Sequence, residues 1–340
     1  MRLIGLAVIL AVSLALAPLA GEAQQQAGKV WRVGDVFAGS AEVSAYLSKA
    51  LEDRLADRGY VNGRNISLIH QFVPPEPARL EKAIATLISN IDVLVVWGTV
   101  SAVAAKKVTG TLPIVFLTVG DPVAIGLAKS LARPGGNMTG VTFEASAETY
   151  GKRLQLLKEC LPDLRRVAVL RAAGDANISP AMASLEHSAP QLRIQLLPID
   201  VRSADDLKSA FATMTKTQAQ GVVVVAGAFT YLNRQQIVEL ALAHHLPSSL
   251  PFKEAVAAGG LVSLGPDLVE MARQGAAYVD KIVRGANPGD LPVEQPTRYE
   301  LHVNLKTAKA LGLTIPQSLL VRADQVIECC SSRARRWCVS

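Results

Sequence analysis

Short apolar runs alternate with longer amphipathic segments along most of this 340-residue chain. In the first half, the pattern predicts strands at 30–37, 66–72, 91–97 and 113–119, and helices at 41–58, 77–90 and 99–109. Strands that alternate with helices form parallel sheets with crossover helices. This half of the chain therefore predicts one compact α/β unit.

The same pattern begins again after residue 146. Strands are expected at 166–170, 194–199 and 221–226, with helices at 148–160, 178–189, 204–218 and 231–245. A long amphipathic helix at 267–284, an alternating strand at 299–304 and a short helix at 306–311 follow. The repeat predicts an α/β fold with two lobes of matched architecture, each with a parallel sheet, and a cleft between them.

The C-terminal part of the chain is expected to cross back over both lobes rather than to form a third domain. One lobe would comprise residues 28–142 with about 266–293, and the other residues 143–265 with about 298–328. Such returns would join the lobes by more than one hinge strand.

The N-terminus has the pattern of a secretory signal peptide, expected to span residues 1–23. Arg2 supplies the positive start, Leu3 to Ala17 form an apolar core, and Gly21-Glu22-Ala23 offers small residues for cleavage. A retained anchor helix is the alternative. Because no cysteine lies near the end of the apolar core, no lipid anchor is predicted. The mature protein is expected to be periplasmic or secreted.

The net charge of +6 does not indicate nucleic-acid binding, because no stripe of Lys and Arg clusters in the body of the chain. The terminal segment 329–340 contributes three arginines and three cysteines: Arg333, Arg335, Arg336, Cys329, Cys330 and Cys338. The cysteine spacing matches no usual zinc site. This tail is expected to be disordered, with cross-linking through its thiols as an alternative.

Motifs of common catalytic sites are absent from the sequence. Phe37-Ala38-Gly39-Ser40 follows the first strand where a dinucleotide-binding enzyme has Gly-x-Gly-x-x-Gly, and no Gly-x-Ser-x-Gly is present. The five histidines lack metal-ligand spacing. A Rossmann-like enzyme is therefore the weaker alternative, and no metal or cofactor is predicted.

The stretch from 112 to 143 indicates small-molecule binding. An apolar strand at 113–119 runs into Gly120-Asp121-Pro122, after which a helix is expected before Pro134-Gly135-Gly136-Asn137 returns the chain to a second short strand. A carboxylate at the carboxyl end of a strand lies where open α/β sheets bind ligands. Asp121 is the candidate partner for an ammonium group, with an Asx turn as the alternative.

A second candidate segment follows the strand that ends at Trp97. Gly98 permits a tight turn, and Thr99 is expected to cap the next helix while its hydroxyl faces the cleft. The backbone amides of Val100 and Ser101 would then meet a carboxylate group. Plain helix capping without a ligand is the alternative.

Further candidates lie at the switch between the halves and in the second half. Asn137 and Thr142 could donate to a ligand or merely close a turn. In the second half, loops that follow buried strands hold four candidates: Asp175, Asn177, Gly227 and Thr230. Aromatic residues at predicted sheet ends could pack against a ligand or belong to the core: Trp97, Phe143, Phe229 and Tyr231.

Several segments resemble one known family. They are Pro113 to Phe116 with Gly120 to Val123, Ser130 to Asn137 with Thr139-Gly140, Gly151 to Leu154, Ala258 to Leu261, Tyr278 to Ile282, Leu291 to Thr297, and Asn304 to Pro316. On these segments, over about residues 30–328, the chain resembles the ABC transporter substrate-binding proteins of the periplasmic-binding-protein type 1 fold. The better-studied members of that group bind tryptophan or tyrosine.

The resemblance implies two Rossmann-like lobes, joined by hinge strands, that close over a ligand and hand it to an ABC permease in the inner membrane. It implies a solute-binding protein that is no enzyme, with an amino acid or related organic acid as ligand. A monomer suits such delivery. A ligand-sensing subunit that reports to a receptor is the alternative.

Two loops depart from the family pattern. Gly227-Ala228-Phe229-Thr230 stands where the family commonly has an acidic Asp-Pro pair, and Ala38-Gly39-Ser40-Ala41 after the first strand is also atypical. These departures leave the ligand itself undefined.

Overall fold

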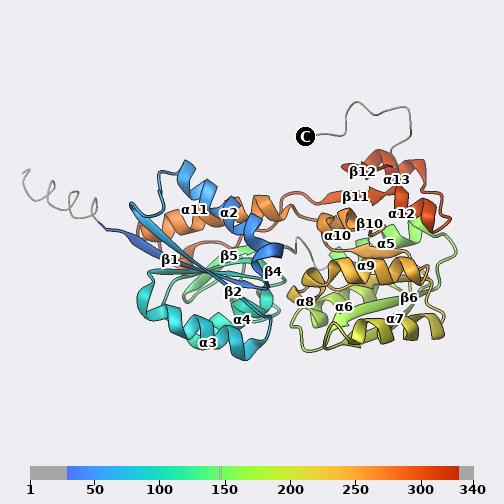
Figure 1. Ribbon diagram of the computed structural model, residues 1–340, viewed down its shortest axis with the longest axis horizontal. Coiled ribbons are helices and arrows are strands. Elements are labelled where there is room, and N and C mark those ends of the chain that lie inside the picture. Colours follow the sequence, from blue (N-terminus) through green and yellow to red (C-terminus); the bar gives the residue numbers. More distant parts are fainter. Residues whose placement is uncertain (1–28, 145, 147, 329–340) are drawn as a thin grey trace, which may run out of the picture.

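The computed structural model describes residues 29–144, 146 and 148–328, which form two lobes side by side (Figure 1). Each lobe has its own β-sheet with helices packed on both faces. The α/β fold predicted from the sequence is confirmed. The predicted signal peptide, 1–23, and the predicted tail, 329–340, lie outside the described residues.

The first lobe contains a five-stranded parallel sheet in the order β2-β1-β3-β4-β5. Its strands are β1 (Trp31–Ala38), β2 (Ile66–Val73), β3 (Val93–Trp97), β4 (Ile114–Val119) and β5 (Met138–Thr142). The central strand β3 is buried along its whole length, as expected for a valine-rich strand with helices on both faces.

Four helices cover this sheet: α2 (Ala41–Asp57), α3 (Pro77–Leu87), α4 (Thr99–Val108) and α11 (Leu268–Val283). Apolar side chains of α2 and α11 pack on one face, and those of α3 and α4 pack on the other. Short 3-10 turns follow two of the helices, η1 (Ile88–Asn90) after α3 and η2 (Pro288–Asp290) after α11. Because α11 lies far along the chain, the first lobe is built from two separate segments.

The helix predicted after Pro122 does not form. In the fully described stretch between β4 and β5, residues 122–127 form turns, and the amides of Leu127 and Ala128 both donate to the Pro122 carbonyl. Gly126, at a φ of 79°, takes a left-handed conformation that a helix does not permit. The apolar residues after Pro122 have helical spacing, but the backbone conformation of Gly126 prevents a helix from forming.

The second lobe contains a seven-stranded sheet in the order β12-β11-β10-β9-β8-β6-β7, parallel apart from the antiparallel pair β10 and β11. Its strands are β6 (Arg166–Ala172), β7 (Gln195–Val201), β8 (Gly221–Val224), β9 (Ser248–Leu250), β10 (Val262–Gly265), β11 (Glu300–Asn304) and β12 (Gln325–Ile327). The antiparallel pair arises because β11 enters this sheet after the chain has returned from the first lobe.

The helices of the second lobe also divide between two faces. They are α5 (Thr149–Cys160), α6 (Ile178–Ser188), α7 (Asp206–Lys216), α8 (Ala228–Leu232), α9 (Arg234–Ala243), α10 (Lys253–Ala257), α12 (Leu305–Ala310) and α13 (Gln317–Arg322). Helices α5, α6, α12 and α13 contribute to one core, and α7, α9 and α10 contribute to the other. The predicted single helix at 231–245 is divided at Asn233, where α8 ends.

The chain passes between the lobes three times, from β5 to α5, from β10 to α11, and from η2 to β11 (Figure 1). Two of these crossings contact each other: Val141 bridges to Glu294, and the Tyr299 hydroxyl donates to the Phe143 carbonyl at 2.7 Å. These crossings lie where the resemblance implies hinge strands. Across the described residues, no helix combines the length and apolar character needed to span a membrane.

Candidate ligand-binding site

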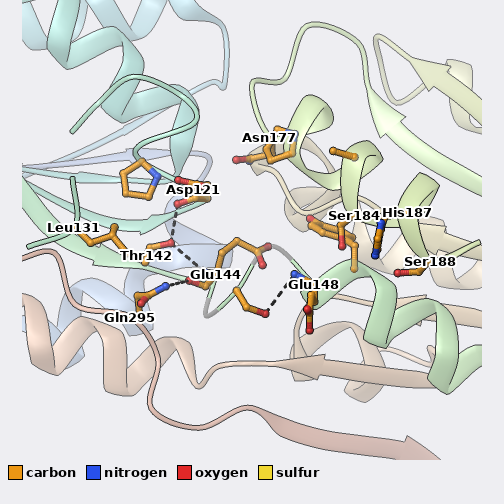
Figure 2. A pocket seen from close by; sticks show the side chains of 16 residues that line it. Asp121, Leu131, Thr142, Glu144, Glu148, Asn177, Ser184, His187, Ser188 and Gln295 are labelled. Carbon is orange, nitrogen blue, oxygen red and sulfur yellow. Dashed lines mark hydrogen bonds between the residues drawn. The ribbon is translucent and has the colours of Figure 1, made fainter. Parts of the chain in front are cut away.

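Two adjoining cavities lie between the lobes, at the carboxyl ends of the first-lobe strands. We call the larger one the acidic cavity; its volume is about 390 Å³. Both lobes and the crossing segments line it, through Gly120, Asp121, Pro122, Leu131, Thr142, Glu144, Ser146, Glu148, Tyr150, Asn177, Pro180, Ala183, Ser184, His187, Ser188 and Gln295. Figure 2 shows Asp121 and Thr142 on one side of it, Ser184 and His187 on the other, and Glu144 between them.

The second cavity, which we call the aromatic cavity, has a volume of about 50 Å³. It is lined by Phe37, Ala38, Leu47, Trp97, Gly98, Thr99, Thr118, Phe143, Asn177, Gly227, Ala228, Tyr231, Phe252 and Leu268. Its rings pack on one another: Phe37 stacks on Trp97 at 4.8 Å between centroids, and Tyr231 meets Phe252 edge to face at 6.0 Å. No charged side chain is among these lining residues.

The two cavities differ in the size of ligand that they admit. Small-molecule sites usually span about 300–1,000 Å³, a range that includes the acidic cavity. A cavity of about 150 Å³ accepts benzene, so the aromatic cavity is too small for a ring while the lobes are in this arrangement. The acidic cavity is therefore the one with room for a small molecule.

Thr99 and Asn177 join the lobes at the boundary between the cavities. The Thr99 hydroxyl donates to Asn177 Oδ1 at 2.9 Å and accepts from the Gly120 amide at 3.0 Å. The Asn177 side chain in turn donates to the Ala226 carbonyl at 3.1 Å. Thr99 was expected to cap α4, but Gly98 is the N-cap residue and the Thr99 hydroxyl bridges to the second lobe instead.

Asp121 and Thr142 both line the acidic cavity, and both also serve the local backbone. Asp121 Oδ1 accepts from the amides of Val123 at 2.9 Å and Ala124 at 3.0 Å, which is the Asx turn that was the alternative for this residue. The Thr142 hydroxyl donates to the Gly120 carbonyl at 2.7 Å. The cavity walls around β4 and β5 are thus fixed before any ligand arrives.

Three candidates from the first lobe do not reach either cavity. Asn137 precedes β5, at the opposite end of the sheet, and its side chain donates to the carbonyls of Thr109 and Leu112. Val100 and Ser101 continue α4 into the lobe and are absent from both sets of lining residues. Asn137 therefore closes a loop, the non-ligand role considered for it.

In the second lobe, Asn177 and Gly227 reach the cavities but Asp175 and Thr230 do not. Thr230 donates its hydroxyl to the Val225 carbonyl at 2.8 Å. Asp175 Oδ1 accepts from the Asn177 amide at 2.9 Å, and its other oxygen lies against Gly227, where a Cβ would be 2.1 Å away. Burial raises the pKa of Asp175 to about 6.

Sequence reasoning missed the group that orients Trp97. The indole Nε1 donates to Asp35, a buried carboxylate that also accepts from the Ser48 hydroxyl and contacts His70 Nδ1, each at 2.7 Å. The hydrogen bond that His70 makes to the Asp35 carboxylate raises the pKa of His70, against the opposing effect of burial. Asp35 lies within a predicted strand, and nothing in the sequence distinguishes it from an ordinary polar residue of that strand.

Sequence reasoning also missed Glu144, which follows β5 on the way to the second lobe. Its side chain is 12% exposed, and Arg153 Nη1 lies 3.7 Å from its Oε1. Burial raises the pKa of Glu144, Arg153 and the nearby Thr149 hydroxyl lower it, and the charge of Asp121 adds to the rise. A single glutamate in a predicted connecting segment gave no signal for this role.

Within the described parts of the chain, no group of three or more His, Cys, Asp or Glu side chains is arranged to hold a metal ion. The arrangement is instead that of a closed interlobe site, with charged groups on one side and rings on the other. Such a site can hold and orient a small organic molecule.

Comparison with known proteins defines the family. The family model described as ABC transporter substrate binding protein matches residues 43–327, which is most of the chain. The chain belongs to this family. It is accordingly a substrate-binding protein and not an enzyme, and proteins of this family are typically extracytoplasmic.

Relatives of this substrate-binding protein support the assignment. A tyrosine-binding protein of Clostridioides difficile (strain R20291) is 25% identical over 266 residues, covering 78% of this chain and 75% of the relative. A conserved domain protein from Vibrio cholerae O1 biovar El Tor has a TM-score of 0.83 at 28% identity, covering 88% of this chain and all of that one.

A third similar protein was solved with a ligand. This domain from Streptococcus pneumoniae, in complex with L-Trp, has a TM-score of 0.82 and 23% identity, again over 88% of this chain and all of the other. At this identity the likeness shows the shared periplasmic-binding-protein fold. It confirms the two-lobed architecture predicted from the sequence.

Proposed function

We propose that this protein is the exported solute-binding component of an ABC importer, which takes an amino acid or related organic acid between its lobes. The lobes would close by bending at the three crossings. The moving bodies would be residues 28–142 with about 266–293, and residues 143–265 with about 298–328. A monomer would hand the ligand to a permease in the inner membrane.

The observation that carries the proposal is the acidic cavity itself. Its wall contains Asp121 and Thr142 from the first lobe, Asn177 and Ser184 from the second, and Glu144 from a crossing. A site shared in this way is completed only when the lobes are together, so a ligand that fills it favours closure. The Thr99–Asn177 hydrogen bond shows that polar groups of the two lobes already meet at its edge.

An amino acid suits the chemistry of the two cavities. The carboxylates around the acidic cavity complement an ammonium group, and the neighbouring rings complement an apolar or aromatic side chain if the lobes move slightly apart. The relative named as a tyrosine-binding protein and the similar domain with bound L-Trp fit the same choice. These observations favour aromatic amino acids among the candidates.

A thermal-shift panel of amino acids, aromatic acids, simple organic acids and sugars tests this proposal. A ligand present at 100 times its dissociation constant should raise the free energy of unfolding by about 2.7 kcal/mol. Because Trp97 lines the aromatic cavity, the same ligand should change its fluorescence. If sugars or simple acids raise the melting temperature and no amino acid does, the amino-acid assignment is wrong.

Export is a separate part of the proposal, supported by the signal-like pattern in residues 1–23. N-terminal sequencing of protein recovered from the periplasm or medium should begin at Gln24. A mature chain that begins at Met1 and stays with the membrane fraction would instead indicate a retained anchor.

A further inference from the structure

The wall of the acidic cavity contains a carboxylate that the described part of the chain leaves unsatisfied. Both side-chain oxygens of Glu144 are buried, and neither has a hydrogen-bond partner among the described residues. Buried polar groups in folded proteins are hydrogen-bonded in the large majority of cases. A carboxylate without a hydrogen-bond donor at the wall of a roomy cavity therefore indicates a place for a donor group from outside the chain.

Arg153 lies near Glu144 but makes no hydrogen bond to it. Its Nη1 is 3.7 Å from Glu144 Oε1, beyond hydrogen-bond distance, and it is absent from the residues that line the cavity. Arg153 Nε donates to the Leu264 carbonyl at 2.9 Å, and the guanidinium lies 4.6 Å from the centre of the Tyr150 ring. Its Nη1 and Nη2 atoms are, like the Glu144 oxygens, buried without a hydrogen-bond partner among the described residues. Glu144 thus has a positive charge nearby, while its two buried oxygens have no hydrogen-bond donor among the described residues.

The other charged groups around the cavity favour a cationic ligand group. Asp121 and Glu148 add two carboxylates to the lining, which also includes His187. Asp121 has one oxygen fixed by the Asx turn to Val123 and Ala124. Even with Arg153 counted, the carboxylates outnumber the fixed positive charge, so an ammonium group would be attracted and a lone carboxylate repelled.

We propose that Glu144 is the counter-ion for the amine of the ligand, and that the acidic cavity selects ligands carrying a primary ammonium group. The ammonium supplies up to three donors, which matches two oxygens that have no hydrogen-bond donor among the described residues. Asp121, the residue that the sequence suggested as the partner of the ammonium group, then attracts that group from a distance while its Oδ1 holds the Asx turn. This inference rests on the proposed function and specifies which group of the ligand enters which cavity.

Calorimetric titrations with four probes test the assignment. The amines are L-tryptophan and L-tyrosine; the deaminated counterparts are indole-3-propionate and 3-(4-hydroxyphenyl)propionate. Wild-type protein should bind at least one of the amino acids about 30-fold or more tightly than its deaminated counterpart, because a buried charge pair would be lost. The Glu144→Gln variant should lose at least about 30-fold affinity for that amino acid and change little towards the deaminated acid.

Glu186→Gln provides a matched control. Glu186 is an exposed glutamate on α6, outside both sets of lining residues, so its substitution should leave all affinities unchanged. If Glu144→Gln fails to fold, Glu144→Asp keeps the charge but withdraws it by one methylene group, and should weaken amino-acid binding without affecting the deaminated acid. The wild-type preference for the amine is measured independently of either variant.

Each result separates this inference from the proposed function. Tight binding of an amino acid that Glu144→Gln leaves unchanged would overturn the role of Glu144 and leave the proposed function standing. Equal loss for amino acid and deaminated acid would also overturn it, since the effect would then be structural. Wild-type protein that binds the deaminated acids more tightly than the amino acids would overturn the selection for amines. Failure to bind any of the four probes would count against aromatic amino acids as ligands, and therefore against this inference as well.

Discussion

The two interlobe cavities differ in how far the protein satisfies their polar groups by itself. Around the aromatic cavity, Thr99, Asn177 and Trp97 all have hydrogen-bond partners within the chain. Around the acidic cavity, Glu144 is buried with none among the described residues. The difference suggests that the aromatic side allows the lobes to close, whereas the acidic side discriminates between ligands.

One partly buried carboxylate, Asp175, sharpens this comparison because it packs beside the aromatic cavity. Asp175 packs against Gly227 at the aromatic cavity, and its folded-state pKa of about 6 lies above the value of about 3.9 for an unfolded chain. The folded state therefore binds the proton more tightly. This group contributes stability that is present below about pH 4 and is lost as the pH rises through about 6.

Asp175→Asn is accordingly expected to stabilise the protein at pH 8, by about 2 kcal/mol. Asparagine retains the oxygen that accepts from the Asn177 amide and removes the buried charge. Urea unfolding of wild type and variant at pH 8 and pH 4 checks this, and the difference should shrink at the lower pH. Ligand affinity should stay unchanged. A variant that is less stable than wild type at both pH values would show that the buried charge of Asp175 does not destabilise the protein.

Gly120→Ala should weaken ligand binding by separating the lobes. A Cβ at Gly120 would lie 2.2 Å from Asn177 Oδ1, which belongs to the other lobe, so closure would meet a steric clash. Overpacking of this kind typically costs about 1–3 kcal/mol, which is about five- to 150-fold in affinity. Small-angle X-ray scattering should show a larger radius of gyration, and calorimetry should show the weaker binding.

Gly110→Ala is the matched control for that change, since a Cβ there meets no atom within 4 Å and the residue does not need positive φ. It should leave both the radius of gyration and the affinity at their wild-type values. If Gly120→Ala behaves in the same way, the lobes do not close at Asn177 as described.

Tyr46→Phe tests another direct contact between the lobes. The Tyr46 hydroxyl on α2 lies 2.7 Å from that of Tyr231 on α8 and donates to Glu254 at 3.3 Å. Loss of a hydrogen bond costs about 1 kcal/mol, so affinity should fall by about fivefold. Tyr60→Phe removes a hydroxyl bonded to Asp280 inside the first lobe, and should reduce stability without changing affinity. Equal affinities for both variants would show that the Tyr46 contact does not assist closure.

Asp121→Asn should have the smallest effect. The amide oxygen can still accept from Val123 and Ala124, so the turn is kept and only the charge is removed. We expect about a threefold loss of affinity for an amine-bearing ligand, measured by calorimetry. A loss as large as that of Glu144→Gln would make Asp121 the direct partner and would reverse the assignment.

The sequence predicted the fold in most respects because strand and helix periods are local properties. The strands, the restart of the pattern and the position of Asp121 and Thr142 at strand ends all follow from such periods. The order of the strands and the return of α11 to the first lobe depend on packing between distant segments. The missing helix after Pro122 shows the limit of local patterns, since Gly126 overrides them.

The site was harder to predict, because its key contacts join residues that are distant in sequence. Thr99 was placed at a helix start, but its bond to Asn177 exists only when the lobes meet. Asn137 was placed near the switch between the lobes, yet the direction of β5 puts it at the far end of the sheet. The surroundings of Glu144 depend on Arg153 of α5 and on burial between the lobes. Neither can be predicted from the sequence of the connecting segment that contains Glu144.

The most direct test of the account is a crystal structure of the protein with L-tryptophan or L-tyrosine, whichever binds more tightly. We predict that the ligand ammonium lies in the acidic cavity, about 3 Å from a carboxylate oxygen of Glu144, with the ligand ring towards Trp97. A ligand outside the interlobe space, or one whose amine faces away from Glu144, would contradict it.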